Sequence, residues 1–476
     1  MKQAIADCNL TDSSDSTPTS QSVGIEPLAL IRSLLFGVMS ACVLLSVALF
    51  NGYPTVYPDT GSYLFTGAFL IALPPFRSPG YSIFIRLTSL GASAWLTIAT
   101  QAIIVVFVLY ETCKHLIGGG SKFRDHCLLA IACVLAALTS LPWEVSLLMP
   151  DVFAAVIFLS VYLLVFDGRL RLAERIALAA ILAISVAAHM SLLPIAALFI
   201  AMLAIPRLAG WRPRGAPAAS TMLAWLLVPI LAAGLSTAAL NRSMGLGFKL
   251  SPSGNQFFLG RLFGDGLTAD YLRANCPKKP FVACRYLNDL PTSPEQFLFW
   301  HPLLHEMDPN GVEIAQIVRG TLAAYPFRFL ASSIHQTLRQ LVKFQTGQEI
   351  RDLALNAPNS NAEIIGQVFP RDVQAFSNSR LIRGRLVSLS SAVAAIDTIV
   401  VWLSAAACLI LARKRRDVKL NRFFYAAIAF LAINAAICAT LAGAYDRYQS
   451  RVAWLVPLCL AFYVAQRFGI GDAAIG

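Results

Sequence analysis

Long apolar runs, separated by short segments rich in lysine and arginine, constrain this chain more than any other feature of its sequence. The run 28–50 alone is long enough to cross a hydrocarbon layer of roughly 30 Å as a helix. Hydrophobic residues make up 57% of the chain and charged residues only 13%, whereas charged residues make up roughly 25% of a typical soluble protein. We therefore predict an all-α polytopic membrane protein.

The basic residues indicate which loops lie on the same side of the membrane. The net charge is +12, and most of the excess falls in clusters at 114–124, 169–175, 207–214 and 413–422. Because cytoplasmic loops are enriched in Lys and Arg, we assign these clusters and both chain ends to the cytoplasm. The positive charge is then a topology signal, and we expect no nucleic acid partner.

Between these loops we predict about ten transmembrane helices. Basic clusters flank 176–205 on both sides, which requires an even number of crossings there. We therefore expect two short helices that turn near His189–Pro194. The predicted crossings lie at 28–50, 95–116, 127–142 and 152–166, twice within 176–205, and at 222–240, 396–412, 423–442 and 452–468.

The predicted crossings divide the chain into four parts. Residues 1–27 are polar and are predicted to form a disordered cytoplasmic tail. Residues 28–240 form an N-terminal transmembrane module, with a first outer loop at 51–94, and residues 396–476 form a C-terminal one. Residues 241–395 contain no convincing crossing and are predicted to form an extracytoplasmic domain.

We expect this outer domain to be mostly helical. Cys276 and Cys284 are its only cysteines, and an oxidising compartment would permit a disulfide between them; two unpaired thiols are the alternative. The disulfide and the basic loops fit the inner membrane of a bacterium with a periplasm. One predicted helix, at 325–345, has apolar residues at helical spacing: Phe327, Leu330, Ile334, Leu338, Leu341 and Val342.

The ionisable residues of the predicted membrane part gather at one level, the outer membrane surface. Proton-coupled pumps usually carry such residues at mid-membrane depth instead. A lipid headgroup would lie at the outer level, so these residues are candidates for a functional site. They are Asp59, Arg77, Glu144, Asp151, His189, Asp397, Asp446, Arg447 and Arg451.

Several short motifs occur at this level. They are Pro58-Asp59-Thr60-Gly61-Ser62-Tyr63, Arg77-Ser78-Pro79-Gly80-Tyr81, Pro150-Asp151, the turn His189-Met190-Ser191, and Arg447-Tyr448. In these motifs the chain resembles the GT-C class of membrane glycosyltransferases, of the aminoarabinose and protein mannosyl transferase type, which use polyprenyl-phosphate sugars. It departs from the pattern of that class in three ways. The first motif has one carboxylate rather than a pair, His189 replaces a Lys, and the outer domain precedes the last three helices.

The resemblance implies transfer of a hexosyl or pentosyl group from a polyprenyl-phosphate donor to a glycan, lipid or protein acceptor outside the cytoplasm. It implies Asp59 as the catalytic base and Asp151 as a second acid that orients the acceptor or a metal. A carboxylate in a partly desolvated cleft suits a base, and arginines pair well with a lipid phosphate. No cofactor is certain, and a divalent cation is left open. The implied substrate-binding residues are Tyr63, Arg77, Tyr81, His189, Arg447, Tyr448 and Arg451.

Other interpretations stay open at this stage. Asp59 follows a proline in a turn-rich stretch, Asp151 is placed to cap a helix, and His189 fits a satisfied turn residue. The arginines are also suited to anchoring the chain at lipid headgroups. For the whole protein, the alternatives are a transporter or lipid flippase, a polysaccharide ligase or polymerase, and a non-catalytic relative of the transferases.

Overall fold

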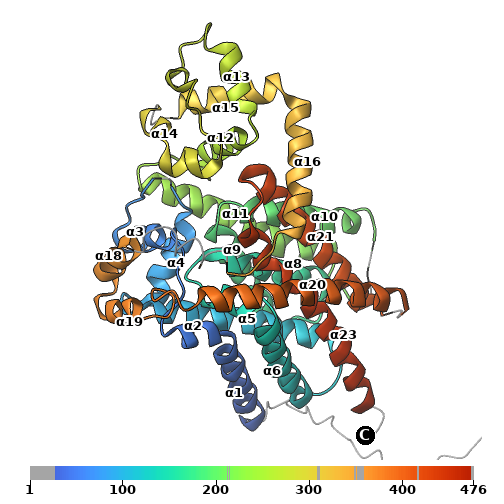
Figure 1. Ribbon diagram of the computed structural model, residues 1–476. Coiled ribbons are helices and arrows are strands. Elements are labelled where there is room, and N and C mark those ends of the chain that lie inside the picture. The colour runs from blue at the N-terminus through green and yellow to red at the C-terminus, as the bar shows by residue number, and fades with distance from the viewer. Residues whose placement is uncertain are drawn as a thin grey trace, which may run out of the picture.

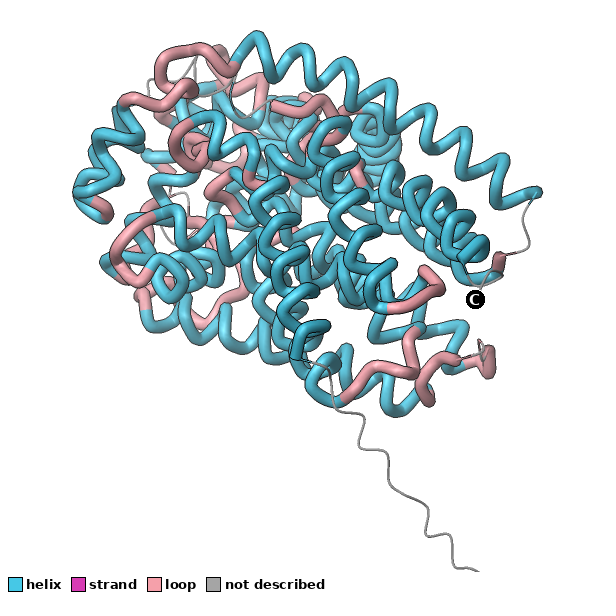
Figure 2. The backbone as a smooth tube through the Cα atoms, turned by 90° about the horizontal axis from the view of Figure 1, so that it is seen from below, coloured by secondary structure: helices cyan, strands magenta, loops and turns pink. Residues whose placement is uncertain are grey.

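The computed structural model describes residues 27–472 apart from 75, 212, 214, 308–310, 348–349, 351–358 and 415–416. Within these residues the regular structure is helical, without a β-strand (Figures 1 and 2). A single isolated bridge pairs Thr55 with Leu147. The all-α prediction is therefore confirmed for the described part of the chain, while the predicted disordered tail lies almost entirely outside it.

Helices occupy the positions of all the predicted crossings. Four of those described are long and apolar enough to cross a membrane, namely α5 (Ala94–Leu116), α11 (Ala219–Ser243), α20 (Val387–Lys414) and α21 (Val418–Leu441). The larger number of ten crossings stays a prediction. The other helices at predicted crossings are α1 (Pro27–Leu44), α2 (Ser46–Asn51), α6 (Ser121–Leu138), α8 (Phe153–Phe166), α9 (Leu172–Ala188), α10 (Leu192–Leu208) and α23 (Leu455–Asp472).

Local sequence explains where several of these helices begin and end. The Ser93 side chain accepts a hydrogen bond from the Trp95 amide at the start of α5, and Asp417 caps α21 through the amides of Lys419 and Leu420. Such caps satisfy amide groups that have no partner within the helix. The chain is extended at His189, which separates α9 from α10 within the stretch where two short helices were expected.

Helix α8 is the central element of the helical body. All 14 of its residues are buried, which matches its almost uninterrupted apolar sequence, since a helix that is hydrophobic all round needs neighbours on every side. It packs against α5, α9, α10, α11 and α21. The short helices α7 (Leu141–Ser146) and η1 (Pro150–Val152) lead into it and thereby place Asp151 at its buried start.

The first outer loop folds into two short helices, α3 (Thr60–Phe69) and α4 (Pro79–Ser89), which pack on each other. The packing around Gly80 explains why the Arg-Ser-Pro-Gly-Tyr motif has a glycine at this position. A Cβ atom at this position would lie 2.1 Å from the carbonyl oxygen of Ala187, so only glycine allows α4 to approach the end of α9 this closely. The motif therefore holds the first loop beside the turn at His189.

A separate lobe stands at the top of the molecule in Figure 1. Its own hydrophobic core includes Leu259, Phe263, Phe297 and Ile317. Helix α16 (Pro326–Val342) leads from the lobe back to the helical body, as the colours of Figure 1 show. The lobe consists of α12 (Gly254–Gly264), α13 (Leu267–Asn275), η2 (Val282–Tyr286), η3 (Gln296–Trp300), α14 (Leu303–Glu306) and α15 (Val312–Ala324).

The predicted outer domain 241–395 is thus divided between two cores. After α16 the chain returns to the body, where Phe344, Ile365 and Phe376 join the main core. The short helices α18 (Asn359–Val368), η4 (Pro370–Asp372) and α19 (Val373–Ser377) belong to this part, and α18 packs on α3. Hydropathy did not reveal this division because both halves are helical and less apolar than the predicted crossings.

The Cys276–Cys284 disulfide is present in the lobe, with the two Cα atoms 5.6 Å apart. It joins the end of α13 to η2. A crosslink of this kind stabilises a fold mainly by restricting the unfolded chain. The disulfide thus adds to the stability that the small core of the lobe provides.

We predict that replacing both Cys276 and Cys284 by Ser lowers the free energy of unfolding of the lobe by about 2–3 kcal/mol. Protease cleavage within 254–324, followed against temperature in detergent, would measure this. Cys133→Ser is the matched control, because Cys133 is an exposed free cysteine on α6. Equal effects of the two changes would contradict the prediction.

Candidate active site

The turn before α3 is fixed by hydrogen bonds that determine where Asp59 lies. Thr60 Oγ1 accepts from the Tyr57 amide at 2.9 Å and donates to the Leu148 carbonyl at 3.3 Å. The side-chain oxygen of Asn361, from α18, accepts from the Gly61 amide at 2.8 Å. Asp59 itself makes no capping bond to α3, so its carboxylate points to other partners.

Two arginines approach the Asp59 carboxylate. Arg77 Nη2 donates to Asp59 Oδ1 at 2.7 Å, and Arg447 Nη1 lies 3.6 Å from Oδ2. The Asp59 side chain keeps 20% of its surface exposed. It is therefore the accessible carboxylate of the site, held by one close and one looser charge contact.

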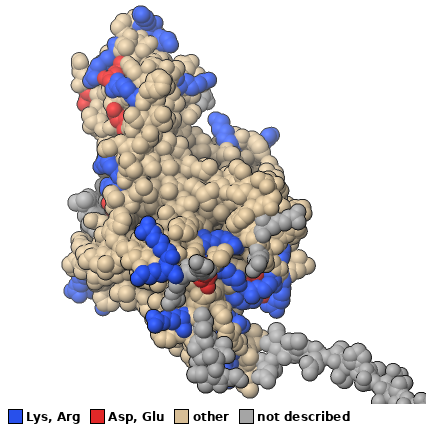
Figure 3. Space-filling view, turned by 90° about the vertical axis from the view of Figure 1, so that its right-hand side faces the viewer, with Lys and Arg blue, Asp and Glu red and all other residues tan. Residues whose placement is uncertain are grey.

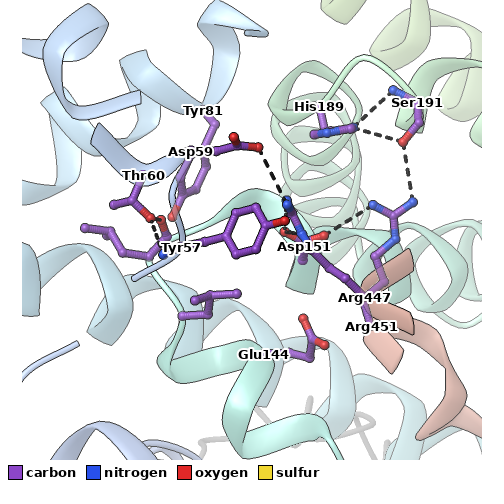
Figure 4. Close-up of polar contacts among 12 residues, drawn as sticks. Tyr57, Asp59, Thr60, Tyr81, Glu144, Asp151, His189, Ser191, Arg447 and Arg451 are labelled. Carbon is purple, nitrogen blue, oxygen red and sulfur yellow. Dashed lines mark hydrogen bonds and ion pairs between the residues drawn. The ribbon is translucent and has the colours of Figure 1, made fainter. Parts of the chain in front are cut away.

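Asp151 is held by two arginines of the short helix α22 (Asp446–Ala453). Arg447 donates to Asp151 Oδ2 from Nε at 3.1 Å and from Nη2 at 2.7 Å. Arg451 Nη1 lies 3.5 Å from Asp151 Oδ1. Residues four apart share one face of a helix, so α22 presents both guanidinium groups to the same carboxylate (Figure 4).

Arg447 links the two carboxylates. Figure 4 shows its guanidinium group between Asp59 and Asp151, and the ring of Tyr57 lies 4.3 Å from the guanidinium carbon. The three charged groups come from the first outer loop, the start of α8 and the last hairpin of the chain. The site thus unites segments almost 400 positions apart, from 59 to 447.

Arg451 extends the network toward the turn at His189. Its Nη2 lies 3.0 Å from Asn434 Oδ1, 3.2 Å from Cys438 Sγ and 3.4 Å from Ser191 Oγ. Ser191 Oγ also lies 2.9 Å from His189 Nδ1. Burial, followed by the positive charge of Arg451, lowers the pKa of His189 to about 3, so this ring is neutral near pH 7.

A cavity of about 530 Å³ opens beside Asp59. The helical body contributes charged and aromatic side chains to it, and the lobe contributes a mainly apolar wall. Asp151, Arg451 and His189 do not line it. The lining residues from the body are Tyr57, Pro58, Asp59, Ser62, Pro74, Arg77, Ala442, Tyr445, Arg447 and Tyr448, and those from the lobe are Phe257, Pro294, Glu295, Leu298, Phe299 and Trp300.

The two tyrosines of the first-loop motifs lie beneath this cavity rather than in it. Tyr63 and Tyr81 are both buried, with ring centroids 5.2 Å apart. The Tyr81 hydroxyl donates to Gln101 Oε1 at 2.6 Å. Their positions indicate a packing role under the site, whereas Tyr448 lines the cavity; substrate binding by Tyr448 stays a prediction.

Most of the aromatic residues that line the cavity were not predicted from the sequence. Tyr57 lies two residues before Asp59, so its proximity was visible in the sequence. Phe257, Phe299 and Trp300 gave no comparable signal, because the packing of the lobe on the body brings them to the cavity. Glu144 was predicted to lie at the outer membrane surface with the arginines. It accepts a hydrogen bond at 2.8 Å from Ser450, the residue before Arg451.

The carboxylates of the site are poorly suited to a metal ion. Among the described residues no group of three or more His, Cys, Asp or Glu side chains could hold one. Both Asp59 and Asp151 face guanidinium groups, which would repel a second cation. The arrangement favours an anion beside the arginines, so we derive no step through a divalent ion.

Comparison of the chain with protein-family models, curated proteins and solved structures yields no match. The chemistry of the site is therefore inferred from its own geometry.

We predict that Asp151→Asn destabilises the protein strongly. Removing one partner of a buried ion pair costs about 3–5 kcal/mol, and here two buried arginines would lose their shared carboxylate. Thermal unfolding in detergent would measure the effect. Asp59→Asn serves as the matched comparison and should cost much less, since Asp59 is partly exposed; a larger loss for Asp59→Asn would contradict this assignment.

The lowered pKa of His189 predicts a pH dependence of stability. Because the ordinary pKa is about 6.5 and the folded value is lower, the unfolded chain binds the additional proton first. The free energy of unfolding should therefore be fully retained above pH 6.5 and should decrease as the pH falls toward 3. Urea titrations in detergent at several pH values would give the free energy of unfolding. Between pH 6.5 and 4, this free energy should change less steeply with pH for His189→Gln than for the unmodified protein, and an equal pH dependence would contradict the prediction.

Proposed function

We propose that this protein is a membrane glycosyltransferase that moves a sugar from a polyprenyl-phosphate donor to an acceptor on the extracytoplasmic face. One observation carries the proposal. An accessible carboxylate and two arginines, Asp59, Arg77 and Arg447, line the same cavity between the helical body and the lobe. This places a base and an anion-binding group together, as transfer from a phosphate carrier requires.

The donor phosphate would bind between Arg77 and Arg447. Arg77 Nε is buried and has no hydrogen-bond partner, although its Nη2 bonds to Asp59. The guanidinium group lines the cavity beside Asp59, where a phosphate oxygen would pair with its charge. Phe257 of the lobe lies 5.3 Å from the same guanidinium group and limits its movement, so the charge is already oriented before a ligand arrives.

Asp59 is the proposed base. Its Oδ1 is held by Arg77, while its Oδ2 has only the longer contact with Arg447. Oδ2 would accept the proton of an acceptor hydroxyl as the acceptor oxygen bonds to the anomeric carbon of the sugar. The bond from that carbon to the phosphate oxygen breaks, and the polyprenyl phosphate leaves with a negative charge that the arginines stabilise.

Asp151 takes a different role in this proposal from the one that the resemblance implied. Its side chain is only 1% exposed, and both oxygens face arginines. It does not line the cavity, and so it would not orient an acceptor directly. Asp151 is instead a positioning residue that keeps Arg447 and Arg451 charged and correctly placed.

The acceptor would bind against the lobe. Phe257, Phe299 and Trp300 line the side of the cavity contributed by the lobe, with Glu295 among them. Aromatic faces with a few polar groups are typical of small-molecule sites. The proposal includes about ten crossings, cytoplasmic termini and a bacterial inner membrane, which place the lobe outside the cytoplasm.

We predict that donor binding and sugar transfer are lost through different substitutions. Arg77→Gln should weaken binding of added polyprenyl phosphate about 10- to 100-fold, because a charge-assisted hydrogen bond contributes about 1.5–3 kcal/mol. Asp59→Asn should keep that binding and lose about 100-fold or more of transfer. Native mass spectrometry of the detergent-purified protein measures the first effect, and transfer from polyprenyl-phosphate sugars extracted from the source membranes measures the second.

Arg319→Gln is the control, because Arg319 is an exposed arginine of the lobe that bonds only to the backbone of its own helix. It should leave binding and transfer unchanged. Failure of the unmodified protein to bind polyprenyl phosphate, or full transfer by Asp59→Asn, would contradict the proposal. Transport assays would follow the first of these outcomes.

A further inference from the structure

Helix α16 has its apolar side chains on the outside. Its large apolar residues at positions 327, 330, 334, 338 and 342 repeat every three or four positions, so they form one stripe along the helix. Each is between 55% and 85% exposed. We call these five residues the α16 stripe: Phe327, Leu330, Ile334, Leu338 and Val342.

The opposite face of α16 is polar and packs on the protein. Ser333 and Gln340 are its buried residues, and the helix runs along α21. The Gln340 side chain donates to the Tyr445 carbonyl at 2.8 Å and accepts from the Tyr445 amide at 2.9 Å. A helix in water buries its apolar face; α16 does the reverse, so its stripe requires an apolar partner or an apolar solvent.

The stripe is continuous with a candidate membrane-spanning surface. Just after α16, the ring of Phe344 lies 6.1 Å from Trp402 of α20, and Thr346 donates to Asp397 of α20 at 2.7 Å. Asp397 lies ten residues into α20, which corresponds to about 15 Å along the helix axis. Exposed Ile399, Trp402 and Leu403 continue the apolar surface along α20.

Charge supports a bilayer rather than a protein as the occupant. Two cations lie at the end of α16 nearest the body. Lys343 is engaged by the protein, because its Nζ donates to the Ala444 carbonyl at 3.2 Å and lies 3.8 Å from Asp446. Arg339 is exposed beside Leu338, and a long arginine side chain reaches from an apolar surface to headgroup phosphates. In Figure 3, charged side chains gather at the tip of the lobe and around the lower half of the molecule, and the surface between them is largely uncharged, with a few Lys and Arg side chains at its edges. Such a band is expected of a surface in contact with acyl chains.

We infer that α16 lies in the outer leaflet, with the α16 stripe against phospholipid acyl chains and the Arg339 side chain extended toward the headgroups. The helix would then anchor the lobe to the bilayer. Because Gln340 holds Tyr445, which lines the 530 Å³ cavity, the anchor would also keep that cavity at the level of the headgroups. The inference depends on a membrane location and not on transferase activity.

The test places a diazirine amino acid at Ile334 or Leu338 in the full-length protein, in vesicles of phosphatidylethanolamine and phosphatidylglycerol. Ile399 on α20 is the benchmark, and the exposed Gln316 of α15 is the control in the lobe. After irradiation, mass spectrometry should find phospholipid adducts at 334 and 338 at yields comparable to 399 and about tenfold above 316. Yields as low as at 316, or crosslinks to a second copy of the chain in place of lipid, would overturn the inference.

Discussion

The buried contacts of Asp151 with Arg447 and Arg451 are the constraint on which the upper half of the helical body depends. A charged group buried without a partner is costly, so the start of α8 and the whole of α22 have to meet. Once they meet, Arg447 also reaches Asp59 of the first outer loop, and Arg451 reaches Asn434 on α21 and Ser191 beside His189. Through these two arginines, the carboxylate at the start of α8 is linked to the first outer loop, the turn at His189 and the last helical hairpin.

The two carboxylates are chemically similar but lie in different surroundings. Asp151 is enclosed and satisfied, with 1% of its side chain exposed, whereas Asp59 keeps 20%. Only Asp59 lines the cavity. In the proposed reaction, this difference makes Asp59 the base and Asp151 a positioning residue, and Arg77 beside Asp59 is a proposed ligand of the phosphate.

The body and the lobe bury their apolar residues in different ways. The lobe has an inner core of its own, as a domain in water does, while the body exposes apolar side chains on α11 and α20. Helix α16 exposes its apolar side chains as the body does, although it begins at the lobe. The cavity forms where the two parts meet, and for this reason its body wall carries Asp59 and the arginines, while its lobe wall is mainly apolar.

The sequence by itself determined the helical class, the positions of the apolar helices and the break at His189. These follow from apolar run length, basic loops and helical period, all of which are local properties. It also indicated the helical spacing of the α16 stripe, but not that the stripe would face outward. Only the tertiary structure decided that 241–395 is divided between two cores, that Tyr63 and Tyr81 lie under the cavity and that Trp300 lines it. It also decided that Asp59 is partly exposed while Asp151 is buried. Burial depends on which distant segments pack against each side chain, and no local sequence pattern encodes that.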